Sequence, residues 1–453
     1  MIALALAVQL IAGAFDVEVL RTTGAPANRV DLVILGDGYR VEDQAKLSTD
    51  AKALLMRLFE VTPWKEYEGL VNVSVVHVIS NEEGADNGSA GMQRDTALNS
   101  YFNCAGNDRT ICFTDSIVNS IATQLTPQFD QLVVLVNDSK YGGSGGTIAA
   151  LSTNAQAPEI LIHELGHSVG GLADEYDLAY PAFPVCNGEC PEPNVSPNSS
   201  ASVKWSHWLE SGTPLPTPEG QPQYASVIGT FEGARYKTTG LYRPKDLCLM
   251  NVLGVPNCSV CTEALIKKFF NRVDPIDASS QTQSMSACQA TFTVTPVAIS
   301  PLAYTWKVNG VDRTAGPTLV LPVGSGLSVS VTATHTTPLV RSDPSNLLKQ
   351  TVTFSPVAAG SGCEVDGGLS EQPDAGDAGS SAGADAGAPD AGLTVVTDSG
   401  VPIDLEDAGF SSTLRVRVMA TSEGCGCGAA PTVGLWWVVA LAAALRRAAR
   451  VTP

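Results

Sequence analysis

Apolar runs typical of strands alternate with helical patterns through residues 15–275, and this alternation limits the possible folds more than any other feature of the chain. The strand-like runs are residues 30–35, 71–79 and 132–136, and the helical patterns between them are residues 41–59 and 115–125. Strands that alternate with helices at this spacing favour an α/β layer around one mostly parallel sheet. We therefore expect residues 15–275 to form an α/β (α+β) domain.

The chain changes character twice after this region. Residues 284–363 are rich in Thr, Val and Ser and contain short alternating runs between Gly and Pro turns, which is typical of an immunoglobulin-like β-sandwich. Residues 364–424 consist largely of Asp-Ala-Gly units with Pro and Ser. Such a segment is too polar to offset the entropy of ordering, so we expect a low-complexity acidic linker there.

The net charge of −19 arises from 27 Lys and Arg against 46 Asp and Glu. Because a polyanion is repelled by nucleic acid, we expect no nucleic-acid partner. We expect a monomer whose partner is a protein or peptide substrate.

Both ends of the chain have the composition of export segments. Residues 1–14 form a short apolar run that ends in small residues, as in a secretory signal peptide, although a buried N-terminal strand or helix is the alternative. Residues 425–453 combine a Gly-Cys-Gly-Cys-Gly motif, an apolar run with two tryptophans and a cluster of arginines. This order predicts a transmembrane helix with its arginines in the cytoplasm, a C-terminal core helix being the alternative.

The C-terminal segment also resembles the sorting segments of exported myxobacterial proteins. That resemblance implies that the chain is held in the membrane before processing and then stays at the cell surface or outer membrane, or is released outside the cell.

Eleven cysteines support export, because an oxidising compartment converts such cysteines into disulfides. They fall into local groups, namely Cys104 with Cys112, Cys186 with Cys190, Cys248 with Cys258 and Cys261, Cys288 with Cys363, and Cys425 with Cys427. We expect short loops closed by disulfides, although the pairing does not follow from the sequence. For Cys258 and Cys261 the alternatives are half of a zinc knuckle or a redox-active pair.

The segment from His163 to His167 reads His-Glu-Leu-Gly-His, which is an HExxH motif. Residues four apart lie on one face of an α-helix, so both imidazoles can bind one cation at the distance of roughly 2.0–2.1 Å that suits zinc. Zinc lowers the pKa of its water ligand towards about 7, and Glu164 can then accept the proton. We predict one catalytic Zn²⁺ held by His163 and His167, with Glu164 as general base. A buried helix with two solvated histidines is the alternative.

A catalytic zinc needs a third protein ligand and one open position. In a continuous helix Asp174 would lie about 16 Å along the axis from His163 and could not reach the metal. Gly170 and Gly171 permit the helix to end in a left-handed turn that folds the chain back. We therefore predict Asp174 as the third ligand, with Glu175 and His207 as alternatives. Asp174 could instead cap the helix or orient an imidazole N–H.

Residues 163–176, HELGHSVGGLADEY, resemble the signature of the bacterial immunoglobulin A peptidase family of zinc metallopeptidases. The segment Ile34–Tyr39 and the cysteines at 248, 258 and 261 add to the resemblance, which extends over residues 17–272. The family implies a metzincin-like catalytic domain in which an edge strand of the cleft aligns an extended peptide. Residues 135–138 and the glycine loop after Tyr141 are the candidates for that edge.

Metzincins carry a third histidine ten residues after the first, and this chain has Ala173 at that position. They also place a methionine beneath the metal, for which Met250 is the candidate. The alternative is a methionine that fills a gap in the core, the usual role of this residue.

The sequence thus predicts a secreted or surface-anchored zinc metalloendopeptidase. A zinc amidase acting on cell-wall material and a surface adhesin with a vestigial catalytic domain are the alternatives, and the intact HExxH motif argues against the adhesin. The physiological substrate does not follow from fold and site.

Overall fold

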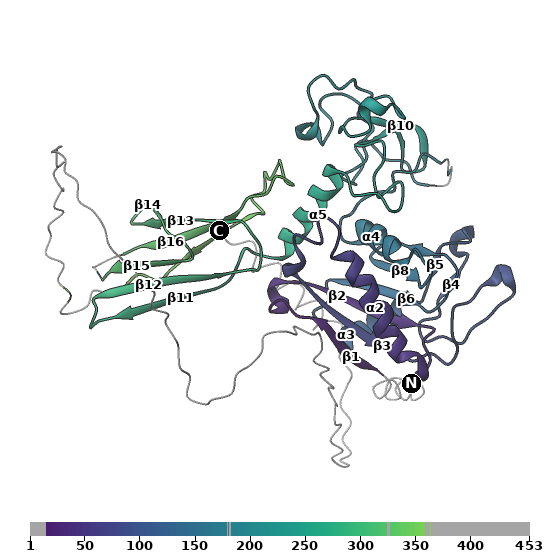
Figure 1. The fold of residues 1–453 in the computed structure, drawn as a ribbon, viewed down its shortest axis with the longest axis horizontal. Coiled ribbons are helices and arrows are strands. Elements are labelled where there is room, and N and C mark those ends of the chain that lie inside the picture. The colour runs from purple at the N-terminus through teal and green to yellow at the C-terminus, as the bar shows by residue number, and fades with distance from the viewer. Residues whose placement is uncertain (1–14, 179, 181–182, 324–326, 358–362, 364–453) are drawn as a thin grey trace, which may run out of the picture. The chain divides into compact units, whose positions relative to one another are not determined.

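The computed structural model describes residues 15–178, 180, 183–323, 327–357 and 363 (Figure 1). The predicted signal peptide, acidic linker and C-terminal transmembrane helix lie outside these residues. Within the described part of the chain, no helix has the length and apolar character needed to cross a bilayer.

A six-stranded sheet forms the centre of the N-terminal region, with strand order β1-β3-β2-β6-β8-β7. Its strands are β1 (Asp16–Arg21), β2 (Val30–Asp37), β3 (Val71–His77), β6 (Gln131–Val136), β7 (Gly143–Ser144) and β8 (Ile148–Ser152). The four inner strands are parallel, whereas the outer strands β1 and β7 run antiparallel to their neighbours. The mixed α/β architecture predicted from the sequence is confirmed.

Both faces of the sheet are covered by helices, because the inner strands are apolar on both sides. Along β2, Leu32 and Ile34 belong to one hydrophobic cluster, while Val33 and Leu35 belong to another on the opposite face. The first cluster includes the helices α2 (Gln44–Leu58), α4 (Ala157–Ser168) and α5 (Ser259–Arg272), and the second includes α3 (Asp115–Leu125). Continuous apolar runs are what parallel strands buried on both faces require.

Smaller elements lie in the connections of this region. The short strands are β4 (Tyr101–Phe102), β5 (Ile111–Cys112), β9 (Phe231–Ala234) and β10 (Lys237–Arg243). The 3-10 helices are η1 (Pro26–Asn28), η2 (Val41–Asp43), η3 (Glu68–Leu70), η4 (Gly88–Ala90), η5 (Cys104–Gly106), η6 (Ser206–Trp208) and η7 (Pro222–Tyr224).

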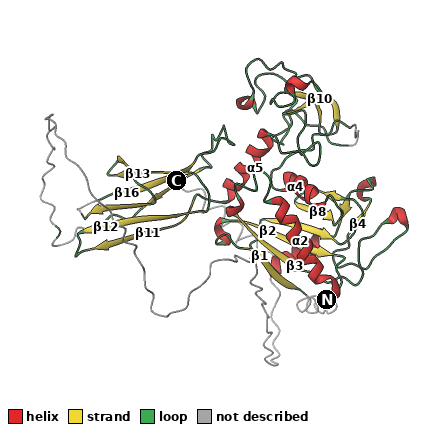
Figure 2. Cartoon of the chain, viewed as in Figure 1, coloured by secondary structure: helices red, strands yellow, loops and turns green. Residues whose placement is uncertain are grey.

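The region after α5 consists of strands and loops as far as the structure describes it (Figure 2). The strands are β11 (Ile276–Ser284), β12 (Gln289–Pro296), β13 (Leu302–Val308), β14 (Val311–Thr314), β15 (Thr318–Pro322), β16 (Val329–His335) and β17 (Lys349–Thr353). They form a three-stranded and a four-stranded antiparallel sheet that share one core around Trp306, which stacks on Phe354. The immunoglobulin-like classification of this region stays a prediction.

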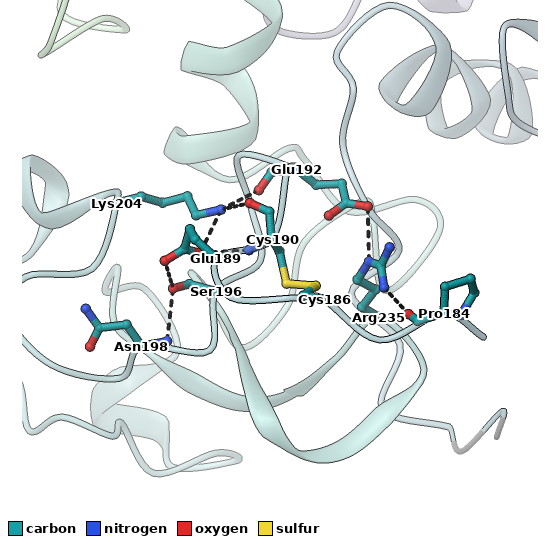
Figure 3. The surroundings of a disulfide bond; sticks show 9 residues. All are labelled: Pro184, Cys186, Glu189, Cys190, Glu192, Ser196, Asn198, Lys204 and Arg235. Atoms are coloured by element: carbon teal, nitrogen blue, oxygen red, sulfur yellow. Dashed lines mark hydrogen bonds and ion pairs between the residues drawn. A yellow bond between two sulfur atoms is a disulfide. The ribbon is translucent and has the colours of Figure 1, made fainter. Parts of the chain in front are cut away.

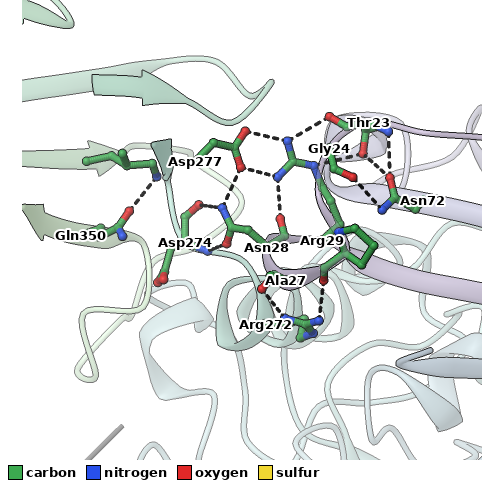
Figure 4. A network of polar contacts seen from close by, with 12 residues as sticks. Thr23, Gly24, Ala27, Asn28, Arg29, Asn72, Arg272, Asp274, Asp277 and Gln350 are labelled. Carbon is green, nitrogen blue, oxygen red and sulfur yellow. Dashed lines mark hydrogen bonds and ion pairs between the residues drawn. The ribbon is translucent and has the colours of Figure 1, made fainter. Parts of the chain in front are cut away.

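A partly buried ion pair connects β11 to the segment before β2 (Figure 4). The guanidinium of Arg29 is 2% exposed and donates to both carboxylate oxygens of Asp277 at 2.7 Å. Hydrogen bonding with Arg29 holds the pKa of Asp277 below its usual range. A two-point contact of this kind fixes direction as well as distance.

Three disulfides close loops as expected, and they join Cys104 to Cys112, Cys186 to Cys190 and Cys288 to Cys363. The expectation is wrong for Cys248, Cys258 and Cys261, which are buried free thiols. The Sγ atom of Cys261 lies 3.7 Å from that of Cys248 and 3.5 Å from that of Cys258. A disulfide requires about 2.05 Å, so these three cysteines are close without being bonded.

Candidate active site

Helix α4 carries the HExxH motif and is anchored by its apolar face. Ile160, Leu161 and Leu165 are at most 3% exposed and belong to the core beneath the sheet. His163 and His167 lie one turn apart on the helix, and their Nε2 atoms are 3.2 Å from each other. The spacing of the motif therefore brings both imidazoles to one point, as the sequence predicts.

Backbone carbonyls fix the orientation of the two rings. His163 Nδ1 lies 3.1 Å from the Leu249 carbonyl oxygen, and His167 Nδ1 lies 2.8 Å from the Leu172 carbonyl oxygen. Because a carbonyl can only accept, the neutral rings carry their proton on Nδ1 and present the Nε2 lone pair to the site. Such contacts are typical of histidines that bind a metal.

Asp174 joins the two histidines. Its Oδ1 atom lies 3.1 Å from His163 Nε2 and 3.4 Å from His167 Nε2. The chain returns to the helix because Gly171 adopts a φ of +65°, where its N–H donates to the His167 carbonyl oxygen at 2.9 Å. This is the glycine-based helix end that the sequence predicts.

The structure places the two alternative ligands elsewhere. Glu175 turns away from the histidines, and its Oε1 atom lies 3.4 Å from Cys261 Sγ. His207 Nε2 instead lies 2.7 Å from the carboxylate of Glu263.

Glu164 is buried beside the histidines and beneath the glycine loop after β6. A Cβ atom on Gly145 would lie 2.7 Å from Glu164 Oε2 and 2.6 Å from His167 Cδ2, so the loop passes as closely as glycine allows. Burial is the main cause that raises the pKa of Glu164 above its ordinary value.

Of the two candidates for the edge strand, the structure bears out the glycine loop after Tyr141 and not residues 135–136. Residues 135–136 belong to β6, which lies between β2 and β8 inside the sheet. The edge is β7, formed by Gly143 and Ser144, so the glycine loop supplies it. A strand of two residues, one of them glycine, has no alternation of its own, so the expectation for this loop rests on the family resemblance and not on a strand pattern.

A cavity of about 500 Å³ is lined by all four predicted site residues, His163, Glu164, His167 and Asp174. Its lining also includes several aromatic or basic side chains, namely Arg109, Tyr141, Tyr176, Phe183 and Tyr236. Glu192, which lies near the Cys186–Cys190 disulfide, also lines the cavity (Figure 3). There Lys204 donates to the carbonyl oxygen of Cys190 at 2.7 Å, and Arg235 donates to the carboxylate of Glu192.

The sequence analysis did not identify Tyr236 and Arg109 as residues of the site. The hydroxyl of Tyr236 donates to Asp174 Oδ2 at 2.5 Å, while the guanidinium of Arg109 lies over the ring of Tyr176 at 5.8 Å. Burial, followed by the charge of Asp174, raises the pKa of Tyr236, so its hydroxyl stays protonated as a donor. No motif connects Tyr236 with a residue 62 positions earlier.

The electrostatics of the site favour a positive charge between its ligands. Burial opposes the charged form of His167, but the hydrogen bond to Asp174 and the nearby carboxylates outweigh it and raise the pKa of His167 to about 9. Asp174 shows the reverse: burial raises its pKa, yet the two histidines bring it well below its usual range.

The ligand atoms of His163, His167 and Asp174 all lie within 4.8 Å of one another. Two imidazole nitrogens and one carboxylate oxygen, reached from a cavity, match the donor set of a catalytic zinc. The residues present therefore fit this ion.

Met250 lies directly beneath helix α4 and is fully buried. A Cβ atom on Gly166 would lie 2.6 Å from Met250 Sδ, so the thioether touches the backbone between the two histidines. The position agrees with the methionine expected below the metal.

Comparison with known families agrees with this geometry. A model described as IgA peptidase M64 matches residues 17–225 and 219–269, more than half of the chain, and includes every residue of the site described above. The chain is therefore a peptidase, and so a hydrolase. It belongs to the IgA peptidase M64 family, whose members are metallopeptidases. A search of curated proteins finds no match.

Proposed function

We propose that this peptidase is an exported zinc metalloendopeptidase, with His163, His167 and Asp174 as metal ligands and Glu164 as general base. The observation that carries the proposal is the convergence of these three ligands beside a buried carboxylate, at a cavity in a chain of a peptidase family. A zinc ion held there would lower the pKa of a water ligand and polarise the peptide carbonyl.

The chain's own residues supply the proton transfers and the positioning. Glu164 accepts a proton from the attacking water and passes it to the departing amine. Its burial suits this role, since a raised pKa brings the carboxylate closer to the pH at which it works. Tyr236 holds Asp174 in place through its hydroxyl.

The glycine loop is the proposed platform for an extended peptide. Gly143, Ser144 and Gly145 line the cavity, and β7 is the outermost strand of the sheet. The N–H of Gly143 already donates to the Arg109 carbonyl oxygen at 3.1 Å, so an extended chain would pair with the backbone of the loop beyond Gly143 and pass its scissile bond across the histidines. A site that binds the middle of a peptide in this way favours internal cleavage.

Export is supported by the three disulfides, which form and persist in oxidising compartments. Attachment to the cell surface rests on the C-terminal segment and is part of the same proposal.

The test compares Glu164→Gln with Glu159→Gln in the full chain. Both changes lie on α4, but Glu159 is in the first turn and pairs with Arg57 away from the cavity. On protein and peptide substrates, the turnover rate of E164Q is expected to be about 10²–10⁴-fold lower than that of wild type, although the variant keeps its zinc. E159Q is expected to stay active. A chelator should abolish wild-type cleavage, and added zinc should restore it.

Unchanged turnover by E164Q would refute the assignment of the base. Chelator-sensitive release of fragments from peptidoglycan, without cleavage of any protein or peptide, would favour the cell-wall amidase instead.

A further inference from the structure

A second group of metal-binding side chains lies behind the candidate active site. It consists of Glu175, Cys248, Cys258 and Cys261, and each is at most 2% exposed. Their ligand atoms all lie within 4.8 Å of one another. They come from three separate segments, namely the chain after α4, the turn that carries Met250 and the start of α5.

The distances suit one tetrahedral ion. With metal–sulfur bonds of about 2.3 Å, two thiolates of a tetrahedral zinc site lie about 3.8 Å apart, and a thiolate and a carboxylate oxygen lie about 3.5 Å apart. The measured separations from Cys261 Sγ are 3.7 Å to Cys248 Sγ, 3.5 Å to Cys258 Sγ and 3.4 Å to Glu175 Oε1.

Within the described part of the chain, one oxygen atom of the Glu175 carboxylate lacks a hydrogen-bond partner. Its Oε1 atom accepts from Asn194 at 2.9 Å, but Oε2 is buried with no hydrogen-bond partner among the described residues. Leaving a buried carboxylate oxygen without a partner is costly, and a bound cation removes that cost. The buried Oε2 atom of Glu175 therefore indicates a bound ligand, and this indication is independent of the three thiols.

The surroundings also stabilise negative charge. Cys258 is the N-cap of α5 and Cys261 lies in its first turn, where the helix dipole favours anions. The backbone N–H of Cys258 points at Cys248 Sγ at 3.2 Å, and that of Cys261 points at Cys258 Sγ at 3.5 Å. Such N–H contacts to sulfur are suited to thiolates.

We propose that Glu175, Cys248, Cys258 and Cys261 bind a second, structural Zn²⁺. Thiolates select soft or borderline ions, and a closed tetrahedral set of four protein ligands is typical of structural zinc. Binding replaces the three thiol protons, which pass to solvent, and no oxidation is involved. The ion also explains why these three cysteines stay reduced in a chain whose other described cysteines form disulfides.

This ion would hold the parts of the active site together, a consequence that rests on the proposed function. Glu175 follows Asp174 directly, and its backbone N–H donates to the Met250 carbonyl oxygen at 2.8 Å. Cys248 precedes Leu249, whose carbonyl oxygen orients His163. One ion would thus fix the third catalytic ligand, the methionine floor and the orientation of a histidine.

The test uses the full chain produced through an oxidising compartment, with zinc content measured by mass spectrometry and the ligands identified by X-ray absorption at the zinc edge. Wild type is expected to hold about two zinc ions per chain. His163→Ala/His167→Ala is expected to keep about one, with three sulfur neighbours at about 2.3 Å. The proposal would be overturned if this double histidine variant holds zinc without sulfur neighbours, or if it holds no zinc.

Matched double substitutions separate this site from the other cysteines. Cys258→Ser/Cys261→Ser is expected to lose one zinc ion, whereas Cys186→Ser/Cys190→Ser removes two cysteines in a disulfide and is expected to keep both. If the first variant fails to fold, wild type still decides the matter. Alkylation after denaturation with a chelator and no reductant should label Cys248, Cys258 and Cys261, and a disulfide between any two of them would overturn the proposal.

The two metal proposals can fail separately. A wild-type chain with one zinc ion surrounded by three sulfurs would support this site and count against the catalytic one. A chain with one zinc ion bound only through nitrogen and oxygen would do the opposite.

Discussion

Replacing Gly145 by alanine tests whether the close approach of the glycine loop is needed for catalysis. The added Cβ would lie 2.6 Å from His167 Cδ2, 2.7 Å from Glu164 Oε2 and 2.8 Å from His167 Cβ. Carbon atoms pack at about 3.5–4.0 Å, so the loop and the two side chains must separate by about 1 Å. The groups that have to move are the proposed base and a proposed metal ligand.

The magnitude follows from the sensitivity of catalysis to position. A displacement of about 1 Å can cost about 10²-fold in rate, which corresponds to about 2.7 kcal/mol of transition-state stabilisation. We expect kcat/KM of G145A on an internally quenched peptide to fall by about this factor. The melting temperature should change little, because Gly145 is exposed at the rim of the cavity.

Gly146→Ala is the matched control. It adds the same methyl group one residue later, where the nearest atom is the Ile148 carbonyl oxygen at 3.9 Å, an ordinary contact. G146A should therefore keep wild-type kcat/KM. If G145A also keeps it, the loop does not press on the catalytic groups and the reasoning is refuted.

Two further substitutions test contacts away from the motif. Tyr236→Phe removes the donor to Asp174 and is expected to weaken zinc affinity about 10–100-fold, measured in competition with a chelator. Tyr180→Phe is the control and should keep the wild-type affinity. Equal zinc affinities of Y236F and wild type would contradict the positioning role of Tyr236. Asp277→Asn leaves the Arg29 guanidinium partly unpaired and is expected to lower the free energy of unfolding at pH 7 by about 2 kcal/mol, since the carboxylate is 25% exposed. Because Arg29 lowers the pKa of Asp277, this stabilisation is complete above the pKa of the unfolded chain, about 3.9, and is lost as the pH falls through the lower pKa of the folded chain. Urea titrations of wild type and D277N at several pH values check this. A difference in the free energy of unfolding that grows in acid would contradict the ion pair.

The central sheet and its helices were predictable because their patterns are local. The run Leu32–Leu35 in β2 is apolar at every position, as a strand covered on both faces must be, and the helical pattern of residues 115–125 matches α3 to the residue. The approach of Asp174 to the histidines was predictable as well, since a glycine pair after a motif helix provides the turn. Periodicity and backbone preference are enough for these features.

Other parts of the site depend on contacts between distant segments. Tyr236 reaches Asp174 from a turn between β9 and β10, and no local pattern marks such a meeting. The cysteine group misled the prediction for a related reason: spacing shows that Cys248, Cys258 and Cys261 can meet, but the separation of their sulfur atoms depends on how α5 packs. Local sequence therefore indicated the motif helix and Asp174, but not the contact of Tyr236 or the unbonded state of the three cysteines.

The carboxylates of Asp174 and Glu175 face opposite ways from adjacent positions. Deleting one residue between Gly171 and Asp174 would bring Glu175 to the place of Asp174 and Tyr176 to the place of Glu175, so that the cysteine group would lose its carboxylate. Side-chain repacking cannot correct such a shift, because the backbone sets it. The length of this short connection is thus as restricted as its chemistry.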